Sequence, residues 1–285
     1  MPIGIIGAGL ILWLAIGAIR GQLVADTLAL QLAFLVIVLI VTAILVWLVF
    51  RPLRKVRRAG KETLLAGTCR FLGFTFEPSA AGFPLGLFYD NGVLEFCNRE
   101  RRNDRISGSL DGVAFDFCEL HLENREASGS GKRRRPRMRT VFLGQVATFV
   151  APTTFRGRTL IARDSGRVGN FLSRVFSGRE RVPIEAPDFE ARYEVYSDDP
   201  ADARALLGPE LRACLLAIAD ELGTRPTVGL VGDRVLLAAD THEDRFEGSG
   251  LTAALDAEAA VRRLLIEVAV IFRMIETLEL TPRRA

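Results

Sequence analysis

The residues best suited to metal or proton chemistry are two histidines that each lie among carboxylates. His121 stands between Glu119 and Glu123, at the two-residue spacing that places side chains on one face of a strand. His242 follows Asp240 in the acidic stretch "DTHEDRFE". Such groups could share a metal ion or a proton if they converged. A solvated strand face and a polar loop have the same composition, so we expect no metal site and no catalytic residue here.

Two glycine-containing stretches look like nucleotide-binding loops, but each lacks a required residue. In "GIIGAGL", Gly7 and Gly9 fit the dinucleotide fingerprint, whereas Leu12 occupies the third glycine position inside an unbroken apolar run. In "SGSGKR", Glu126 occupies the first glycine position of a phosphate loop, and Arg133 replaces the hydroxyl residue that holds Mg²⁺. We therefore expect no nucleotide cofactor.

The overall composition indicates a folded chain without a metal-binding cysteine motif. Of the 285 residues, 49% are hydrophobic and 25% are charged, and the formal net charge is +3. These fractions are typical of folded proteins, and this net charge is too small to indicate a nucleic-acid binder. No cysteine pair has the CxxC spacing of zinc-ribbon or thioredoxin-like sites. We expect no cofactor, and we expect buried thiols at Cys69, Cys97, Cys118 and Cys214.

Two long apolar segments lie within the first fifty residues, before the elements that would position any site. Residues 2–19 and 28–50 carry no charged side chain, and the eight residues "RGQLVADT" join them. A helix needs about 20 residues to cross the hydrocarbon core of a bilayer. The sequence therefore predicts a two-helix transmembrane hairpin over residues 1–50. A cleaved signal peptide is the alternative for the first segment, which lacks the basic region that such peptides carry.

A dense basic cluster follows the second apolar segment and predicts the orientation of the hairpin. Positively charged flanks remain on the cytoplasmic side of a membrane. The sequence thus predicts a multi-pass protein of the bacterial inner membrane, with the N-terminus and the C-terminal domain in the cytoplasm. We expect this cluster to contact the membrane surface through Arg51, Arg54, Lys55, Arg57 and Arg58.

The predicted fold class of residues 51–285, which follow the hairpin, is α+β, with mainly antiparallel strands covered by helices. A basic juxtamembrane helix is predicted over 51–73 and a cytoplasmic domain over 74–285, ending in a long amphipathic helix over about 251–278. Turn residues predict hairpins at Asn91-Gly92 and at Gly232-Asp233. Asp199 is placed to cap a helix that begins at Pro200. Predicted strands cover 74–77, 86–90, 93–98, 112–124, 140–150, 158–163, 181–185 and 189–197, and a short helix is predicted at 168–176.

A second basic cluster lies in a predicted loop at about 125–139. Such a cluster can contact anionic lipid headgroups, at about 1 kcal/mol for each cation near the surface. RNA contact is the alternative, although the flanking residues offer no array of exposed aromatic rings for stacking on bases. We expect membrane-surface contact from Lys132, Arg133, Arg134 and Arg135.

The stretch "DFEARYEVYSDDPADARALLGPEL", with "FRGRTLIARD" and "DGVAFDFCELHLEN" before it, carries a family resemblance. It resembles the bacterial membrane-associated family catalogued as domain of unknown function 3137 (DUF3137), over about two-thirds of the chain. The resemblance implies no established activity and no catalytic residues, and many members carry a pair of hydrophobic spans. Tyr193 stands where the family usually has Phe. The matching positions include Phe155, Gly157, Phe189, Glu190, Val195, Tyr196, Ser197, Asp199, Ala203, Arg204, Leu206, Leu207 and Pro209.

Together these observations favour a noncatalytic binding or scaffold module anchored in the membrane. The expected partners are the lipid bilayer with its anionic headgroups and another membrane or cytoplasmic protein. The same observations are also compatible with a homo-oligomer. The first alternative is a membrane-anchored enzyme acting on lipid or peptide, whose chemistry would come from Glu119, His121, Asp240 and His242. The second alternative is nucleic-acid or anionic-lipid binding through the arginine-rich loop.

Overall fold

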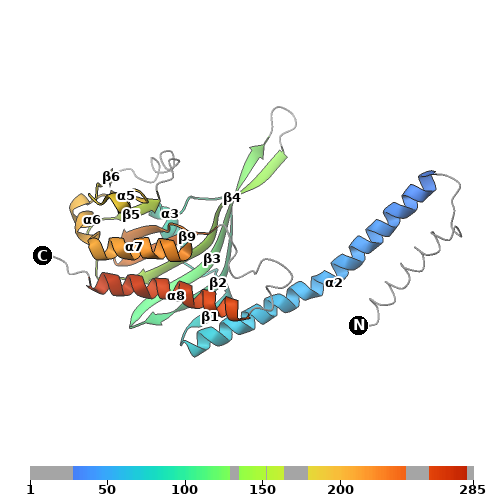
Figure 1. The fold of residues 1–285 in the computed structure, drawn as a ribbon, viewed down its shortest axis with the longest axis horizontal. Helices are drawn as coiled ribbons and strands as arrows, with labels where there is room; N and C mark the ends of the chain where they lie inside the picture. Colours follow the sequence, from blue (N-terminus) through green and yellow to red (C-terminus); the bar gives the residue numbers. More distant parts are fainter. Residues whose placement is uncertain (1–27, 129–134, 152, 164–178, 242–256, 281–285) are drawn as a thin grey trace. The chain divides into compact units, whose positions relative to one another are not determined.

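A computed structural model describes residues 28–128, 135–151, 153–163, 179–241 and 257–280 (Figure 1). The chain divides into two compact units, Met1–Glu62 and Thr63–Ala285. In the described part of the first unit, the side chains between Phe34 and Trp47 are largely exposed. The second unit contains the sheet and the hydrophobic core.

The predicted transmembrane hairpin is not found, and this corrects both the fold class and the localisation. Residues 28–50 form the beginning of α2, a single helix over Leu28–Phe71 that does not end at Phe50 and runs on through the basic cluster. Over the described ranges, none of the helices combines the length and the apolar character needed to span a membrane. The prediction of a multi-pass inner-membrane protein is therefore wrong. The other predicted span, residues 2–19, lies outside the described residues.

Nine strands form one sheet in the described residues, and every pair in it is antiparallel. The strand order is β1-β2-β3-β4-β9-β8-β5-β7-β6. The first four strands follow one another along the chain, and β4 then pairs with β9. The strands are β1 (Thr75–Ser79), β2 (Arg99–Leu110), β3 (Val113–Ser128), β4 (Arg135–Val150), β5 (Thr159–Arg163), β6 (Glu180–Arg181), β7 (Tyr193–Ser197), β8 (Thr227–Val231) and β9 (Arg234–Asp240).

Both faces of the sheet are covered because apolar residues alternate along its strands. On the helix face, Phe115 and Phe117 of β3 belong to the core that includes α7 and α8, which lie side by side in Figure 1. On the opposite face, called the loop face here, Leu120 and Leu122 pack with α3 and residues 80–97. The described helices that lie wholly in this unit are α3 (Leu85–Asp90), α5 (Pro187–Glu190), α6 (Pro200–Leu206), α7 (Pro209–Leu222) and α8 (Ala257–Leu280), and the end of α2 adds Leu65 and Cys69 to its core.

Several local predictions are corrected by the structure. Residues 86–90, predicted as a strand, belong to helix α3, in which Leu85 and Phe88 are buried one helical turn apart. Asn91 consequently caps a helix rather than turning a hairpin, and residues 93–98 form no strand. The predicted strand at 189–197 begins only at Tyr193, because α5 precedes it. The predicted helix at 168–176 lies outside the described residues.

Candidate functional site

The three described residues of the enzymatic alternative, Glu119, His121 and Asp240, do not come together. Glu119 and His121 alternate with Leu120 and therefore lie toward the helix face, whereas Asp240 is in register with Gly144 and Leu120 and lies toward the loop face. Glu119 is buried, and Nε2 of His121 lies 3.1 Å from Oγ1 of Thr140. In the described part of the chain, no three potential ligand residues could hold a metal ion. His242 lies outside that part.

Six of the nine predicted surface-contact residues lie on two described elements. Arg51, Arg54, Lys55, Arg57 and Arg58 lie within α2. Arg135 is the first residue of β4, while Lys132, Arg133 and Arg134 lie outside the described residues. The four cysteines are free and buried, as expected.

The segment predicted as a basic loop is largely a two-stranded ribbon, which we call the arm. Pairing of β3 with β2 begins at Glu123, and pairing of β4 with β9 begins at Gly144. Residues 124–128 and 135–139 pair with each other beyond these points, and Figure 1 shows the arm projecting from the sheet. At its base, Asn98 N donates to Oδ1 of Asn124 (3.0 Å), and Arg125 N donates to Oδ1 of Asn98 (3.1 Å).

Exposed arginines occupy both faces of the arm. Met138 is in register with Arg125, so these two side chains share a face, while Arg137 and Arg139 alternate with Met138 and point to the other face. All four side chains are exposed. The arm therefore presents positive charge in two opposite directions.

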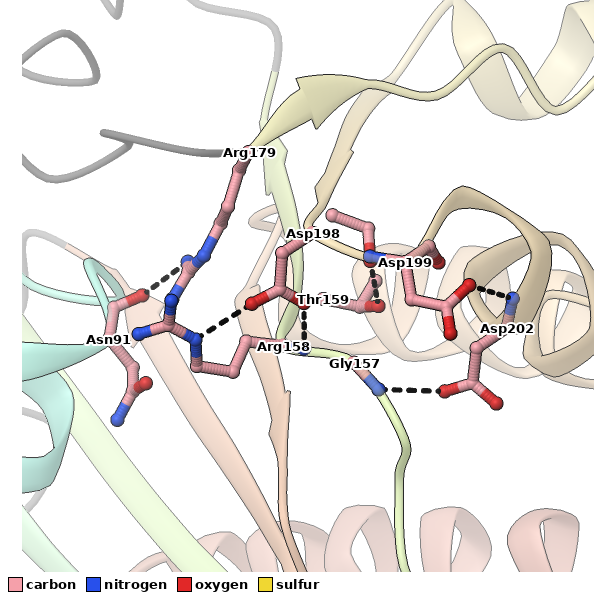
Figure 2. A network of polar contacts seen from close by, with 9 residues as sticks. Asn91, Gly157, Arg158, Thr159, Arg179, Asp198, Asp199 and Asp202 are labelled. Atoms are coloured by element: carbon pink, nitrogen blue, oxygen red, sulfur yellow. Dashed lines mark hydrogen bonds and ion pairs between the residues drawn. The ribbon is translucent and has the colours of Figure 1, made fainter.

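A second polar site joins the start of β5 to the end of β7 and is drawn in Figure 2. The hydroxyl groups of Thr159 and Ser197 are buried and lie 2.9 Å apart, on residues that are in register. Asp202 Oδ2 accepts hydrogen bonds from the N–H groups of Arg156 (3.1 Å) and Gly157 (3.3 Å). We call this set of contacts the clasp. It binds the loop before β5 to the first turn of α6 through backbone donors.

Gly157 is the point of closest approach in the clasp. A Cβ atom on Gly157 would lie 2.6 Å from Cβ of Asp199 and 3.1 Å from its backbone nitrogen. A side chain at this position would have to displace the backbone of the following helix cap. The glycine of the "FRGRT" motif is thus explained by packing.

One side of the clasp brings two arginines together. Asp198 accepts hydrogen bonds from the backbone N–H of Arg158 (2.6 Å) and from its Nε (2.9 Å). Nη1 of Arg179 donates to the carbonyl oxygen of Asn91 (3.1 Å), and Figure 2 shows its guanidinium beside that of Arg158. Partial burial acts to raise the pKa of Asp198, but the hydrogen bonds and charge of Arg158 outweigh it, so the pKa lies below its ordinary value.

The other motif residues of the family resemblance have packing or capping roles. Phe189 stacks on Tyr193 with ring centroids 5.1 Å apart. Glu190 accepts a hydrogen bond from the N–H of Ile184 (2.9 Å), and Arg204 donates to the carbonyl of Pro183 (3.4 Å). The motif is therefore explained mainly by the fold. Sequence reasoning did not single out Arg158, Arg179 or Asp198, although two of these flank the motif glycine and the helix cap.

Asp199 caps α6, as predicted, and its replacement gives a direct test of this cap. Its Oδ1 accepts hydrogen bonds from the N–H groups of Ala201 (3.1 Å) and Asp202 (3.0 Å). We expect Asp199→Ala to lower the free energy of unfolding by about 1–2 kcal/mol, measured by urea denaturation of the full chain. Asp199→Asn retains the acceptor and should stay near the wild-type value. Equal losses in both variants would show that the cap bond is not what matters.

Comparisons with known proteins match the chain to a family and to one solved structure. Residues 140–280 match the family described as "Protein of unknown function (DUF3137)", which confirms the resemblance to DUF3137 over these residues. The match does not test the expectation that the family is bacterial and membrane-associated. None of the curated proteins compared matches the chain. The chain is similar to the crystal structure of the mycobacterial trehalose monomycolate transport factor A, TtfA, at 11% identity and a TM-score of 0.47. This likeness covers 78% of this chain and 97% of that one.

Proposed function

Because residues 140–280 belong to DUF3137, a family of unknown function, we propose a function from the geometry: a noncatalytic scaffold that binds an acidic protein through the arm. The observation that carries this proposal is the projection of the paired strands beyond β2 and β9, with exposed arginines on both faces. An isolated two-stranded ribbon is at best marginally stable in water. A partner that encloses the arm would supply the missing contacts.

The distribution of charge favours a protein over a flat anionic surface. Arg125 lies on one face of the arm and Arg137 and Arg139 on the other, so a headgroup layer could contact only one set at a time. A groove lined with carboxylates could contact both sets. Met138 is 38% exposed between the arginines, and methionine and arginine are both enriched at protein interfaces. The small net charge and the lack of aromatic rings on the described part of the arm disfavour nucleic acid.

The test uses a photocrosslinking residue, benzoylphenylalanine, in place of Met138 in the full chain produced in cells. We expect one nuclease-resistant protein adduct, which mass spectrometry identifies. The variant R125E/R137E/R139E should reduce the adduct by about tenfold or more, because three favourable charge contacts become repulsive. A matched control, R70E/R181E/R225E, changes the net charge equally at other exposed positions and should leave the adduct unchanged.

Three outcomes would contradict the proposal. An adduct only with nucleic acid would assign the arm to the nucleic-acid alternative, and an adduct only with lipid would assign it to a membrane surface. An adduct of equal yield in both charge-reversed variants would mean that the arginines of the arm do not select the partner.

A further inference from the structure

Exposed aromatic and acidic side chains gather on α3 and on the segment that joins it to β2. Phe96 is 74% exposed, and its ring packs against that of Tyr89 with centroids 5.4 Å apart. Leu87 of α3 is exposed as well. Asp90 and Glu95, next to the two rings in the chain, are exposed, and neither forms an ion pair with a described residue. We call these five residues the base patch.

Hydrogen bonds fix the base patch to β2 and to the core of the loop face. The hydroxyl of Tyr89 donates to Oε2 of Glu100 (3.1 Å) and lies 3.6 Å from Sγ of Cys97. Cys97 is buried among the apolar residues of the loop face, and its thiol donates to the carbonyl of Arg99 (3.3 Å). A surface that is already held in place loses little conformational entropy when a partner docks on it.

The base patch lies where the arm leaves the sheet. Asn98, two residues after Phe96, forms hydrogen bonds with Asn124 and Arg125, the first residues of the arm. From this point the arm projects from the sheet (Figure 1). Its strands stay paired over 124–128 and 135–139, so the described arm does not fold back on its own base. A second copy of the chain, in contrast, can bring its arm to this base patch.

The arm and the base patch are complementary in charge and in apolar character. On the arm, Met138 is exposed beside Arg125. The side chains of Arg125 and Arg137 are exposed and form no ion pair with a described residue. On the base patch, the exposed ring of Phe96 stands beside two carboxylates. A guanidinium can pair with a carboxylate and stack on an aromatic ring, and a thioether packs favourably on such a ring.

We propose that the acidic protein bound by the arm is a second copy of this chain, whose base patch receives the arm. This inference rests on the proposed function, because it names the partner of the arm. Two copies related by a twofold axis make the contact twice, since each arm lies on the base patch of the other copy. The formal net charge of +3 does not oppose the pairing, because charges beyond about 10 Å are screened at 0.1 M salt.

The experiment places benzoylphenylalanine at Phe96 in a full chain that carries one epitope tag. This chain is produced in cells together with a full chain that carries a different tag. We expect a photocrosslinked adduct that contains both tags, and peptide mapping should locate the crosslink in the arm of the second chain. Association of the two copies through any other surface would give no crosslink between Phe96 and the arm.

Reversing the charges on each side tests the pairing itself. D90K/E95K in the chain with the photocrosslinker, or R125E/R137E in the other chain, should each lower the adduct yield by about tenfold or more, because attraction becomes repulsion. The two variants together should restore the yield to within about threefold of the wild type, since the charges are then exchanged. Side chains that serve only to keep one chain folded would show no such rescue.

The matched control is D188K/E210K, which makes the same change of charge at two exposed carboxylates outside the base patch. It should leave the adduct yield unchanged. Circular dichroism establishes that each variant is folded. Because the crosslink of the wild-type sequence is mapped directly, the inference is tested even if one of the reversed variants does not fold.

Four results would overturn the inference: no adduct with both tags, an adduct of Phe96 with a different protein, a crosslink outside the arm, or no rescue by the combined reversal. The proposed function is judged separately, at Met138. An adduct of Met138 with another protein that depends on the arginines of the arm would leave that function standing while this inference fails. An adduct of Met138 with lipid or nucleic acid alone would remove both.

Discussion

Replacing Gly144 with alanine is expected to lower the free energy of unfolding by about 3 kcal/mol or more, as overpacking against backbone does at its most severe. Gly144 lies on β4 where that strand begins its pairing with β9. A Cβ atom there would overlap the carbonyl oxygen of Ala239 and approach the backbone nitrogen of Thr241 to 3.0 Å. These are backbone atoms in the middle of the sheet and cannot move aside as a flexible side chain could.

Gly67→Ala provides the matched control for this prediction. Gly67 lies in the part of α2 that belongs to the second unit, and a Cβ atom there would meet nothing within 4 Å. Alanine in an exposed helix interior should stabilise by up to about 1 kcal/mol. Guanidinium denaturation of the two full-length variants measures the difference. Similar stabilities of the two variants would mean that β4 and β9 pack less tightly at Gly144 than the distances indicate.

The second large effect is expected at Tyr193, where two substitutions should differ strongly. The ring is 1% exposed and stacks on Phe189, while its hydroxyl donates to the carbonyl of Leu215 at 3.5 Å, the long limit for such a bond. Tyr193→Ala should lower the free energy of unfolding by about 3–5 kcal/mol, because a large ring leaves the core. Tyr193→Phe should lower it by about 1 kcal/mol or less.

Tyr193 also gives an expected dependence of stability on pH. Burial raises the pKa of Tyr193 above the ordinary value of 10.0. Above about pH 10 the unfolded chain loses this phenolic proton while the folded chain keeps it, so the folded state binds more protons and stability falls as pH rises. Urea midpoints between about pH 9 and 11 should fall less steeply in Tyr193→Phe than in wild type. Parallel curves would show that another group controls alkaline unfolding.

Elements with a strong local pattern could be predicted from the sequence. The predicted strand at 112–124 is confirmed by β3, in which Phe115 and Phe117 belong to one hydrophobic cluster, and Cys118, Leu120 and Leu122 belong to the other. Gly223 ends α7 in the left-handed conformation with φ of +65°, as expected for a glycine after the last turn. The hairpin at Gly232-Asp233 is confirmed by the register of Val231 with Arg234.

Elements that depend on distant partners could not be predicted in this way. Residues 99–110, "RERRNDRISGSL", contain few apolar residues, and only Ile106 among them enters the core. They form β2 because β1 and β3 pair with both of its edges. Residues 86–90 were predicted wrongly because a short apolar run is compatible with either a strand or a helix. They form a helix, and its residues Leu85 and Phe88 are buried against the sheet.

The candidate sites were predictable only in part. Basic residues in the segment 125–139 were evident from the sequence, but strand pairing beyond β2 and β9 is what makes them an arm. The meeting of Arg158 with Arg179 depends on β5, β7 and β6 being neighbours in the sheet. No local spacing relates these two residues, so only the topology could bring them to one place.

The pairing of β4 with β9 also determines how long one edge of the sheet stays unpaired during synthesis. Leu143 and Asp240, which form a hydrogen bond across it, are 97 positions apart in the chain. A ribosome adds about 5–20 residues per second, so β4 would wait roughly 5–20 s for its neighbour. During that interval the first four strands can pair through local hairpins, while Phe115, Phe117 and the edge of β4 lack the covering that α7, α8 and β9 later provide. We therefore expect the nascent chain to bind chaperones during this interval, and its yield to depend on translation speed between β4 and β9.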